Sequence, residues 1–185
     1  MSNNKAPMIY TPTHVYFLYS NHPFSNFYPA KFKMRLSHLD HGGRIHEFSC
    51  TEAAYMFKKA MYFDDIETAN LILQETNPYE IKRLGRQVKN FDDKEWTTVR
   101  MTKMLIVNTY KYQQNPDLGK ILLETGYRTL VESSSRDLAW GSGVKIDDPD
   151  LFTKEWTGNN LLGHVLGKVR ALLEYQSDMS NMLQN

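Results

Sequence analysis

Three short segments in the first quarter of the chain have hydrophobic and polar positions that suit strands. The segment 14–19 (HVYFLY) is rich in residues that favour strands, residues 30–36 alternate roughly between apolar and polar side chains, and residues 44–49 are expected to return as a third strand. The loop at 21–29 and the turn at 38–43 (HLDHGG) separate these segments, and both contain the residues that favour turns. The pattern therefore predicts three strands, with a hairpin turn between the second and the third.

After the third strand, apolar residues recur at helical spacing. Ser49 precedes Glu52 by three residues, the spacing of a capping box, and opens a predicted helix over 51–62. The next helix is expected to begin at an Asp64 cap. Further helices are predicted from cap residues, from prolines in a first turn and from glycines at a helix end. They cover residues 64–75, 77–88, 92–113, 115–125 and 160–175. RTLVE at 128–132 predicts one more strand.

The two ends of the chain lack this patterning. Residues 1–12 are polar and contain two prolines, so they are expected to form a flexible tail, and residues 177–185 are expected to form a polar tail. No internal repeat or linker interrupts residues 13–176. We therefore expect one compact, mostly helical α+β domain with a small antiparallel sheet.

Composition is that of an ordinary globular protein. The 185 residues are 41% hydrophobic and 23% charged, which is enough to form a core without disulfides. The formal net charge is +1, so no global field draws the chain to nucleic acid or to a membrane. Cys50 is the single cysteine, and the sequence has neither a signal-peptide pattern nor an apolar run of about 18 residues. These features favour a cytoplasmic protein that does not enter membranes.

The familiar motifs of cofactor, metal and nucleophile sites are missing from the sequence. It contains no GxGxxG, no Walker loop and no GxSxG elbow, and no His stands in an obvious pair with Cys50. No two histidines have helical metal-ligand spacing with a carboxylate partner. His38 and His41, at the predicted hairpin tip, are more typical of surface imidazoles. We therefore expect no metal and no redox cofactor.

Two carboxylates stand among aromatic residues. Glu52 is flanked by Cys50 and Phe57, and Asp137 lies beside Trp140 in the loop SSSRDLAWGSG. A carboxylate in such surroundings can serve as an acid or a base. A capping role for Glu52 and a loop cap or surface charge at Asp137 explain the same pattern, and spacing alone does not decide between these interpretations.

Three cations recur at helical spacing. Lys82, Arg86 and Lys89 stand at positions i, i+4 and i+7, so they are expected to share one helix face. Such a row can hold a phosphate, although it is more often a solvated face. Both interpretations stay open at this stage.

Several longer segments are informative through their full amino-acid sequence and not only through the spacing of single residues. They are FLYSNHPFSNFYPAKF at 17–32, FSCTEAAYMFKKAMYF at 48–63, LGRQVKNF at 84–91, KYQQNP at 111–116, LVESSSRDLAWGSG at 130–143 and WTGNNLLG at 156–163. In this order and combination, the chain resembles the NADAR family, also described as YbiA-like N-glycosidases. The resemblance runs from about residue 16 to residue 173. No one segment is decisive, but the series is quite specific.

The resemblance implies a compact, mostly helical α+β fold and hydrolysis of N-glycosidic bonds. Similar proteins act on ribosyl-phosphate intermediates of riboflavin synthesis or remove ADP-ribose from guanine bases. Glu52, Trp96 and Asp137 match positions tied to activity in the family, and Lys59 matches the Lys of its E-x6-K pattern. Met56 stands where many members have Gln, a departure that concerns substrate choice more than the chemistry.

The residue types suit this reaction. Breaking a base–ribose bond builds positive charge at the sugar carbon, which one carboxylate can stabilise while a second group assists the leaving base. We expect Glu52 to activate water and Asp137 to act as its partner, although the assignment could be reversed. We expect the rings of Tyr28, Trp96 and Trp140 to stack on the base of the substrate. The cations Lys59 and Arg86 are expected to neutralise its phosphate, and Gly141 is also expected to bind the substrate.

Three functions remain open on the sequence. The first is a hydrolase of riboflavin-pathway ribosylamine phosphates, and the second is an ADP-ribosyl-guanine hydrolase acting on nucleotides or nucleic acid. The third is a non-catalytic module that binds ADP-ribose or another nucleotide. A small nucleotide-like substrate is expected in the first case, and nucleic acid is a partner only in the second. The sequence leaves the oligomeric state open.

Overall fold

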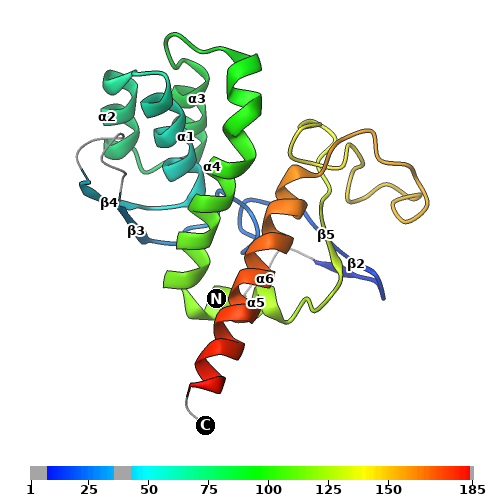
Figure 1. Cartoon of the computed structure of the whole chain (residues 1–185). Coiled ribbons are helices and arrows are strands. Elements are labelled where there is room, and N and C mark those ends of the chain that lie inside the picture. The colour runs from blue at the N-terminus through cyan, green and yellow to red at the C-terminus, as the bar shows by residue number, and fades with distance from the viewer. Residues whose placement is uncertain (1–7, 36–42, 184–185) are drawn as a thin grey trace, which may run out of the picture. The chain divides into compact units, whose positions relative to one another are not determined.

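The computed structural model describes residues 8–35 and 43–183, which divide into two compact units (Figure 1). The terminal unit comprises the described residues up to Ser25 and from Asp117 onward, and the central unit comprises residues 26–116 apart from 36–42. Within the described ranges the chain forms six helices and five strands, which confirms the α+β class. None of these helices is both long and apolar enough to cross a lipid bilayer.

The terminal unit contains a three-stranded sheet in the order β1-β2-β5. Strand β2 (His14–Phe17) pairs antiparallel with β1 (Ile9–Tyr10) and parallel with β5 (Thr129–Glu132). Helix α5 (Pro116–Leu123) precedes β5, and helix α6 (Leu161–Met182) packs against that strand (Figure 1). The residues that form a hydrophobic cluster in this unit are Tyr16, Val131, Val144 and Leu151, with Ile9 and Trp156 packed against them.

Three features of the terminal unit differ from the expectation. Residues 9–10 form a strand inside the expected tail, because Ile9 packs on the hydrophobic cluster while its backbone pairs with Tyr16. The β2–β5 pairing is parallel, so the sheet is mixed rather than wholly antiparallel. Helix α6 continues to Met182, past the predicted end near residue 175 and into the expected C-terminal tail, through a mostly exposed and polar stretch without an apolar repeat.

In the central unit, helices surround a short hairpin. Strands β3 (Phe32–Arg35) and β4 (Ile45–Phe48) pair antiparallel, with Phe32 opposite Phe48. The helices are α1 (Thr51–Tyr62), α2 (Ile66–Gln74), α3 (Pro78–Arg86) and α4 (Asp93–Gln114). Helix α1 contacts the other three helices and β4, so it is the centre of this unit. The predicted hairpin turn, with His38 and His41, falls almost entirely outside the described residues.

Most helix starts follow the predicted caps. The Asn77 side chain accepts a hydrogen bond from the backbone N–H of Tyr79 (3.0 Å), and Asp92 accepts one from Glu95 (2.7 Å). These bonds satisfy N–H groups that have no partner within the helix. The predicted starts of α3 and α4 are therefore confirmed.

Two predicted caps are wrong. The N-cap of α1 is Cys50, whose side chain makes no capping bond, so Ser49 and Glu52 do not form a capping box. The backbone N–H of Glu52 instead donates to the carbonyl of Asn26 (2.9 Å), which fixes the helix start by tertiary contact. The cap of α2 is Asp65 rather than Asp64, because Asp64 lies in the left-handed region with φ 55° and ends the preceding turn.

The predicted row of cations is also wrong. Helix α3 ends at Arg86, so Lys89 lies beyond it and does not continue its face. The Lys89 ammonium pairs with Glu67 (2.7 Å), and its backbone N–H donates to Asp65 (2.8 Å). The early end of α3 therefore removes the third member of the row.

Asp65→Asn is expected to lower the free energy of unfolding by about 1–2 kcal/mol. The two carboxylate oxygens of Asp65 accept from the backbone N–H groups of Thr68 and Lys89, and an amide nitrogen in place of either oxygen would face a donor. Urea denaturation measures the change. The matched control is Asp64→Asn at the exposed neighbouring position, where the left-handed backbone suits Asn. Equal stability of the two variants would contradict this account of the cap.

Candidate functional site

Glu52 lies in the first turn of α1 and is buried, with 4% of its surface exposed. Its backbone bond to Asn26 ties the helix start to the loop that carries Phe27 and Tyr28. A second bond, from the N–H of Ala30 to the carbonyl of Ser49 (3.0 Å), closes the same contact. The NFYP loop (residues 26–29) and the first turn of α1 are separated in sequence, but these two hydrogen bonds hold them together in the central unit.

Helix α4 adds buried polar groups to this unit. Asn108 is fully buried, and its amide nitrogen donates to the carbonyl of Met104 (3.1 Å) and lies 3.5 Å from the side-chain oxygen of Asn26. Among the described residues, the Asn108 oxygen and the buried hydroxyl of Thr51 have no hydrogen-bond partner. Buried polar atoms are usually paired, so these two are exceptions in the interior of this unit.

Lys111, one helical turn beyond Asn108, was not predicted from the sequence. It is fully buried, and its ammonium lies 5.8 Å from the ring centroid of Tyr28 and 5.0 Å from that of Tyr112. Burial lowers the pKa of Lys111 to about 7, against a smaller opposing effect of Cys50. Burial in turn raises the pKa of the Cys50 thiol. The predicted base-stacking residue Tyr28 therefore lies close to a lysine that readily loses its proton.

The two predicted phosphate-binding cations have different surroundings. Lys59 lies near the end of α1, where its ammonium donates to the carbonyl of Gly85 (2.9 Å) and lies 3.8 Å from the ring centroid of Phe91. Burial lowers the pKa of Lys59, while the charge of Asp93 acts in the opposite direction. Arg86 is exposed at the end of α3. Lys59 thus already joins two helices, and phosphate binding by either residue stays a prediction.

Trp96 lies inside an aromatic cluster of the central unit. It is 6% exposed, and its ring centroid is 5.4 Å from Tyr55, 5.8 Å from Tyr62 and 6.1 Å from Phe63. Rings in such contact stabilise a core, which favours packing over base stacking for this Trp. Tyr28, half-buried in its loop, keeps more of its ring accessible.

The second half of the predicted site lies in the terminal unit. Asp137 is half-buried, and one of its carboxylate oxygens accepts a hydrogen bond from the backbone N–H of Trp140 (3.1 Å). The N–H of Asp137 donates to the hydroxyl of Ser134 (3.3 Å). Asp137 therefore caps its own loop, in agreement with the loop-cap alternative that the sequence left open. The same hydrogen bond fixes the carboxylate beside the half-buried Trp140. The pairing of Asp137 with Glu52 stays a prediction, because the two residues belong to different units.

Gly141 is buried in the turn that Asp137 closes. A Cβ there would lie 2.7 Å from the Cβ of Ser134 and 2.9 Å from the carbonyl oxygen of Asp137, so any other residue would displace the loop. The Gly141 carbonyl accepts from the N–H of Asn160 (2.9 Å). The structure gives Gly141 a packing function, and substrate binding at this position stays a prediction.

Asn160 joins this loop to the sheet and to α6. Its side chain accepts from the N–H of Glu132 (3.0 Å) and donates to the carbonyl of Leu130 (2.8 Å), both on β5. The next two N–H groups of the chain, at Leu161 and Leu162, donate to loop carbonyls at 3.2 and 3.1 Å. The start of α6 is therefore capped by the same loop that holds Asp137.

No metal cluster is present in the part of the chain that the structure describes. Residues 8–35 and 43–183 contain no group of three or more His, Cys, Asp or Glu side chains placed to hold an ion.

The chain is similar to a family model and to several known proteins. Residues 15–174 match the family model of the NADAR domain. N-glycosidase R617 of Acanthamoeba polyphaga mimivirus is 37% identical over 80% of this chain and 86% of its own length. Protein irg-1 of Caenorhabditis elegans is 34% identical over 87% of this chain and 82% of its own length.

Two further similarities concern a longer protein and a solved structure. Riboflavin biosynthesis protein VVA0006 of Vibrio vulnificus is 27% identical over 88% of this chain, which spans 39% of that protein. The NMR structure of the Escherichia coli protein YbiA superposes with a TM-score of 0.69 at 23% identity, covering 91% of this chain and 89% of that one. The structural likeness supports the α+β fold.

Lys111→Met is expected to flatten the dependence of stability on pH. The folded chain releases the Lys111 proton near pH 7, whereas an unfolded lysine holds its proton up to about pH 10.4. Folding therefore releases a proton between these values, and the free energy of unfolding of the wild-type protein rises with pH across that window.

Urea denaturation between about pH 6.5 and 9.5 tests this linkage. Lys94→Met, at an exposed position of the same helix, is the control and should keep the wild-type slope. An unchanged slope in Lys111→Met would show that Lys111 titrates normally in the folded chain.

Proposed function

The chain belongs to the NADAR domain family, and on this premise we propose that it hydrolyses the base–ribose C–N bond of ribosylamine phosphates such as the intermediates of riboflavin synthesis. The observation that carries the proposal is the match over residues 15–174, in which the segments around Glu52 and Asp137 are both folded and held by backbone hydrogen bonds. A small nucleotide-like molecule is the corresponding substrate.

The reaction class follows from family membership. The chain is a hydrolase of N-glycosyl bonds, like the relative named N-glycosidase that is 37% identical over 150 residues. The narrower choice of substrate is supported by the relative named for riboflavin biosynthesis. Because this chain spans 39% of that protein, the substrate belongs to the proposal.

Glu52 is the residue we propose to act on water and on the sugar. Cleavage of the C–N bond develops positive charge at the ribose carbon, and a fixed carboxylate stabilises that charge most strongly where water is scarce. Glu52 is buried, and it lies in the first turn of α1, where the positive end of the helix dipole favours its ionised form. The bond from its N–H to Asn26 holds the turn in place.

Asp137 is the proposed partner on the sugar or the base. Its cap to the N–H of Trp140 fixes the carboxylate relative to the ring that we propose to stack on the leaving base. In this scheme Tyr28 contributes a second ring, and Lys59 neutralises phosphate. The roles of Asp137 and Lys59 rest on their match to the family pattern, and those of Tyr28 and Trp140 rest on the ability of an aromatic ring to stack on a planar base.

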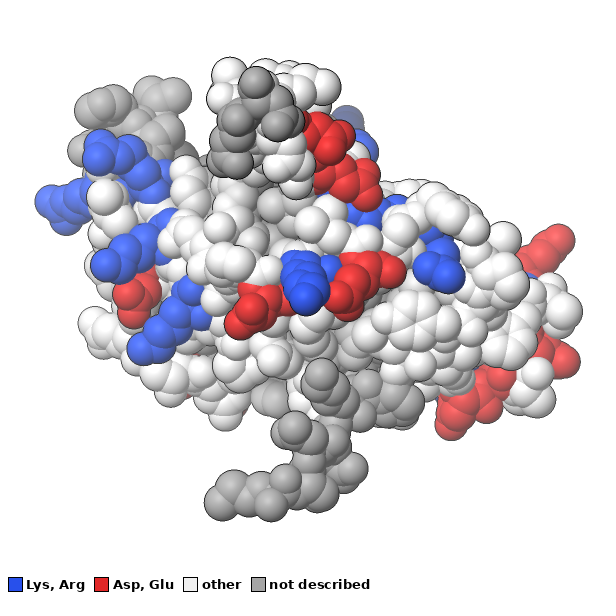
Figure 2. All heavy atoms as spheres, turned by 90° about the horizontal axis from the view of Figure 1, so that it is seen from below, with Lys and Arg blue, Asp and Glu red and all other residues white. Residues whose placement is uncertain are grey.

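Removal of ADP-ribose from guanine is the second candidate, and the near-neutral charge limits its substrate. Basic and acidic side chains both appear on the face shown in Figure 2, and the formal net charge of the chain is +1. Binding to long nucleic acid depends on clustered cations. A modified nucleotide is therefore favoured over a long strand if this second activity is the real one.

Base release from two substrates tests the proposal. A riboflavin-pathway ribosylamine phosphate and an ADP-ribosylated guanosine are incubated with the protein, and the released base is identified by chromatography and mass spectrometry. Glu52→Gln is expected to lower kcat by about 10²–10⁴-fold on the first substrate, while ligand affinity stays within about tenfold. Glu47→Gln, at an exposed carboxylate of β4, is the control and should keep wild-type rates.

Each outcome distinguishes one function from the others. Cleavage of the first substrate alone, lost in Glu52→Gln, supports the proposal, and cleavage of the second alone replaces it with ADP-ribose removal. Nucleotide binding without base release from either substrate would indicate a binding module instead. Circular dichroism of Glu52→Gln separates loss of chemistry from loss of folding.

A further inference from the structure

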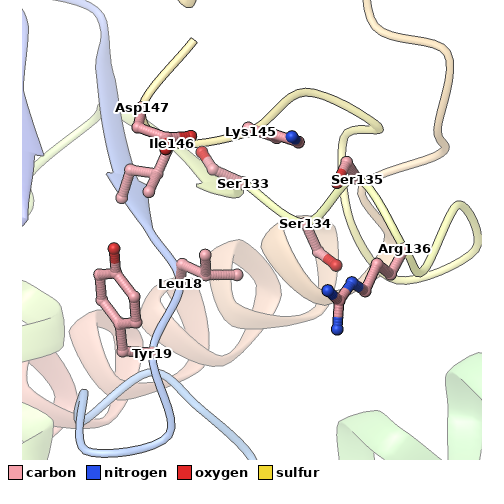
Figure 3. Close-up of a pocket in the computed structure, with 9 residues that line it drawn as sticks. All are labelled: Leu18, Tyr19, Ser133, Ser134, Ser135, Arg136, Lys145, Ile146 and Asp147. Atoms are coloured by element: carbon pink, nitrogen blue, oxygen red, sulfur yellow. The ribbon is translucent and has the colours of Figure 1, made fainter.

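A pocket of about 340 Å³ lies within the terminal unit. It is lined by Leu18 and Tyr19, which follow β2, by residues 133–136 and by residues 145–147 (Figure 3). None of these residues belongs to the set predicted from the sequence to bind the substrate. The pocket is large enough for a phosphate together with a sugar.

Three successive serines, at 133–135, line this pocket. Ser133 is fully buried, and its backbone N–H donates to the carbonyl of Phe17 (2.8 Å), which holds it against β2. Its hydroxyl has no hydrogen-bond partner among the described residues. Leaving a buried hydroxyl unpaired is costly, so this group favours a ligand that accepts a hydrogen bond.

Positive charge prevails around the serines. Arg136 and Lys145 line the pocket, and Asp147 is the acidic residue among its lining side chains. In Figure 3 the hydroxyl of Ser134 and the guanidinium of Arg136 point to the same side of the pocket. A guanidinium beside hydroxyl donors matches the oxygens of a phosphate, which accept several charge-assisted hydrogen bonds at once.

We infer that this pocket binds a phosphate group, either the phosphate end of a ribosyl substrate or free phosphate. It contributes a buried hydroxyl donor and two cations against one carboxylate, from within one compact unit. Of the two cations predicted from the sequence for this task, Lys59 already donates to Gly85, and both Lys59 and Arg86 belong to the other unit. The inference rests on the proposed function only for the identity of the molecule that carries the phosphate.

Calorimetric titration of the full chain with ribose 5-phosphate tests the pocket, with ribose as the uncharged comparison and inorganic phosphate as the second ligand. Arg136→Gln and Lys145→Gln are each expected to weaken binding of ribose 5-phosphate by about tenfold. Asp147→Asn should tighten it by about two- to fivefold, because it removes a like charge. Lys120→Gln, at an exposed position of α5, is the matched control and should bind as the wild type does.

Loss of a cation is expected to weaken binding and loss of the Asp147 charge to strengthen it, so the variants together test whether the pocket binds an anion. Binding of ribose as tight as that of ribose 5-phosphate, or wild-type affinity in Arg136→Gln and Lys145→Gln together, overturns the inference. If inorganic phosphate binds as tightly as ribose 5-phosphate, the site is a phosphate site that free phosphate fills. Tighter binding of the sugar phosphate supports the substrate as the occupant.

The same variants separate this inference from the proposed function. If the protein releases no base but still binds ribose 5-phosphate through Arg136, the proposed function fails and the phosphate site stands. If it releases base and Arg136→Gln leaves the KM for the phosphorylated substrate unchanged, the reaction stands without this site. Ser133→Ala, which removes the buried hydroxyl with a small change in volume, is expected to weaken binding about threefold or more.

Discussion

Burial of charged side chains on α1 is the constraint around which the central unit is arranged. Glu52, Lys58 and Lys59 are each at most 8% exposed, although they belong to a helix at the centre of a hydrophobic unit. A buried charge destabilises a fold by several kcal/mol unless neighbouring dipoles compensate it. For Lys59 the compensation comes from the carbonyl of Gly85 and the ring of Phe91. The close approach of α3 to α1 is therefore an electrostatic requirement as well as a packing one.

This approach explains why a glycine stands in α3. A Cβ on Gly85 would lie 2.0 Å from the sulfur of Met56, so a larger residue would force the helices apart or displace the methionine. Met56 is the residue at which we expect, from the sequence, a departure from many members of the family. Its contact with Gly85 lies one helical turn from Lys59, and a change at this position therefore acts on the surroundings of the buried ammonium.

Much of the fold could be predicted from local signals, and the remainder depends on distant contacts. Helices α3 and α4 have their caps, Asn77 and Asp92, encoded within four residues. The start of α1 is set by Asn26, far away in sequence, so its cap could not be identified from spacing. The parallel pairing of β2 with β5 also could not be predicted, because the sequence of neither strand specifies its partner.

The same difference applies to the candidate site. Glu52 and Asp137 could be identified because carboxylates within segments shared with a family suggest acid–base chemistry, whereas Lys111 and Ser133 were missed although they lie in such segments too. Lysine and serine are normally exposed, and only the surrounding helices or strands make these two buried.

The motifs that identify the family are connected to one another by hydrogen bonds. The loop around Asp137 and the turn around Asn160 share backbone bonds, and so do the NFYP loop and the start of α1. A substitution in one motif therefore disturbs its partner segment.

The order of the two units along the chain has a consequence for synthesis. The central unit is one continuous segment, whereas the sheet of the terminal unit joins β2, made near the beginning, to β5, in which Thr129 pairs with His14. Such a long-range pairing closes a large loop and forms slowly compared with local helices. On the ribosome the whole central unit has been made before β5 emerges, so its helices can assemble while β2 still waits for its parallel neighbour.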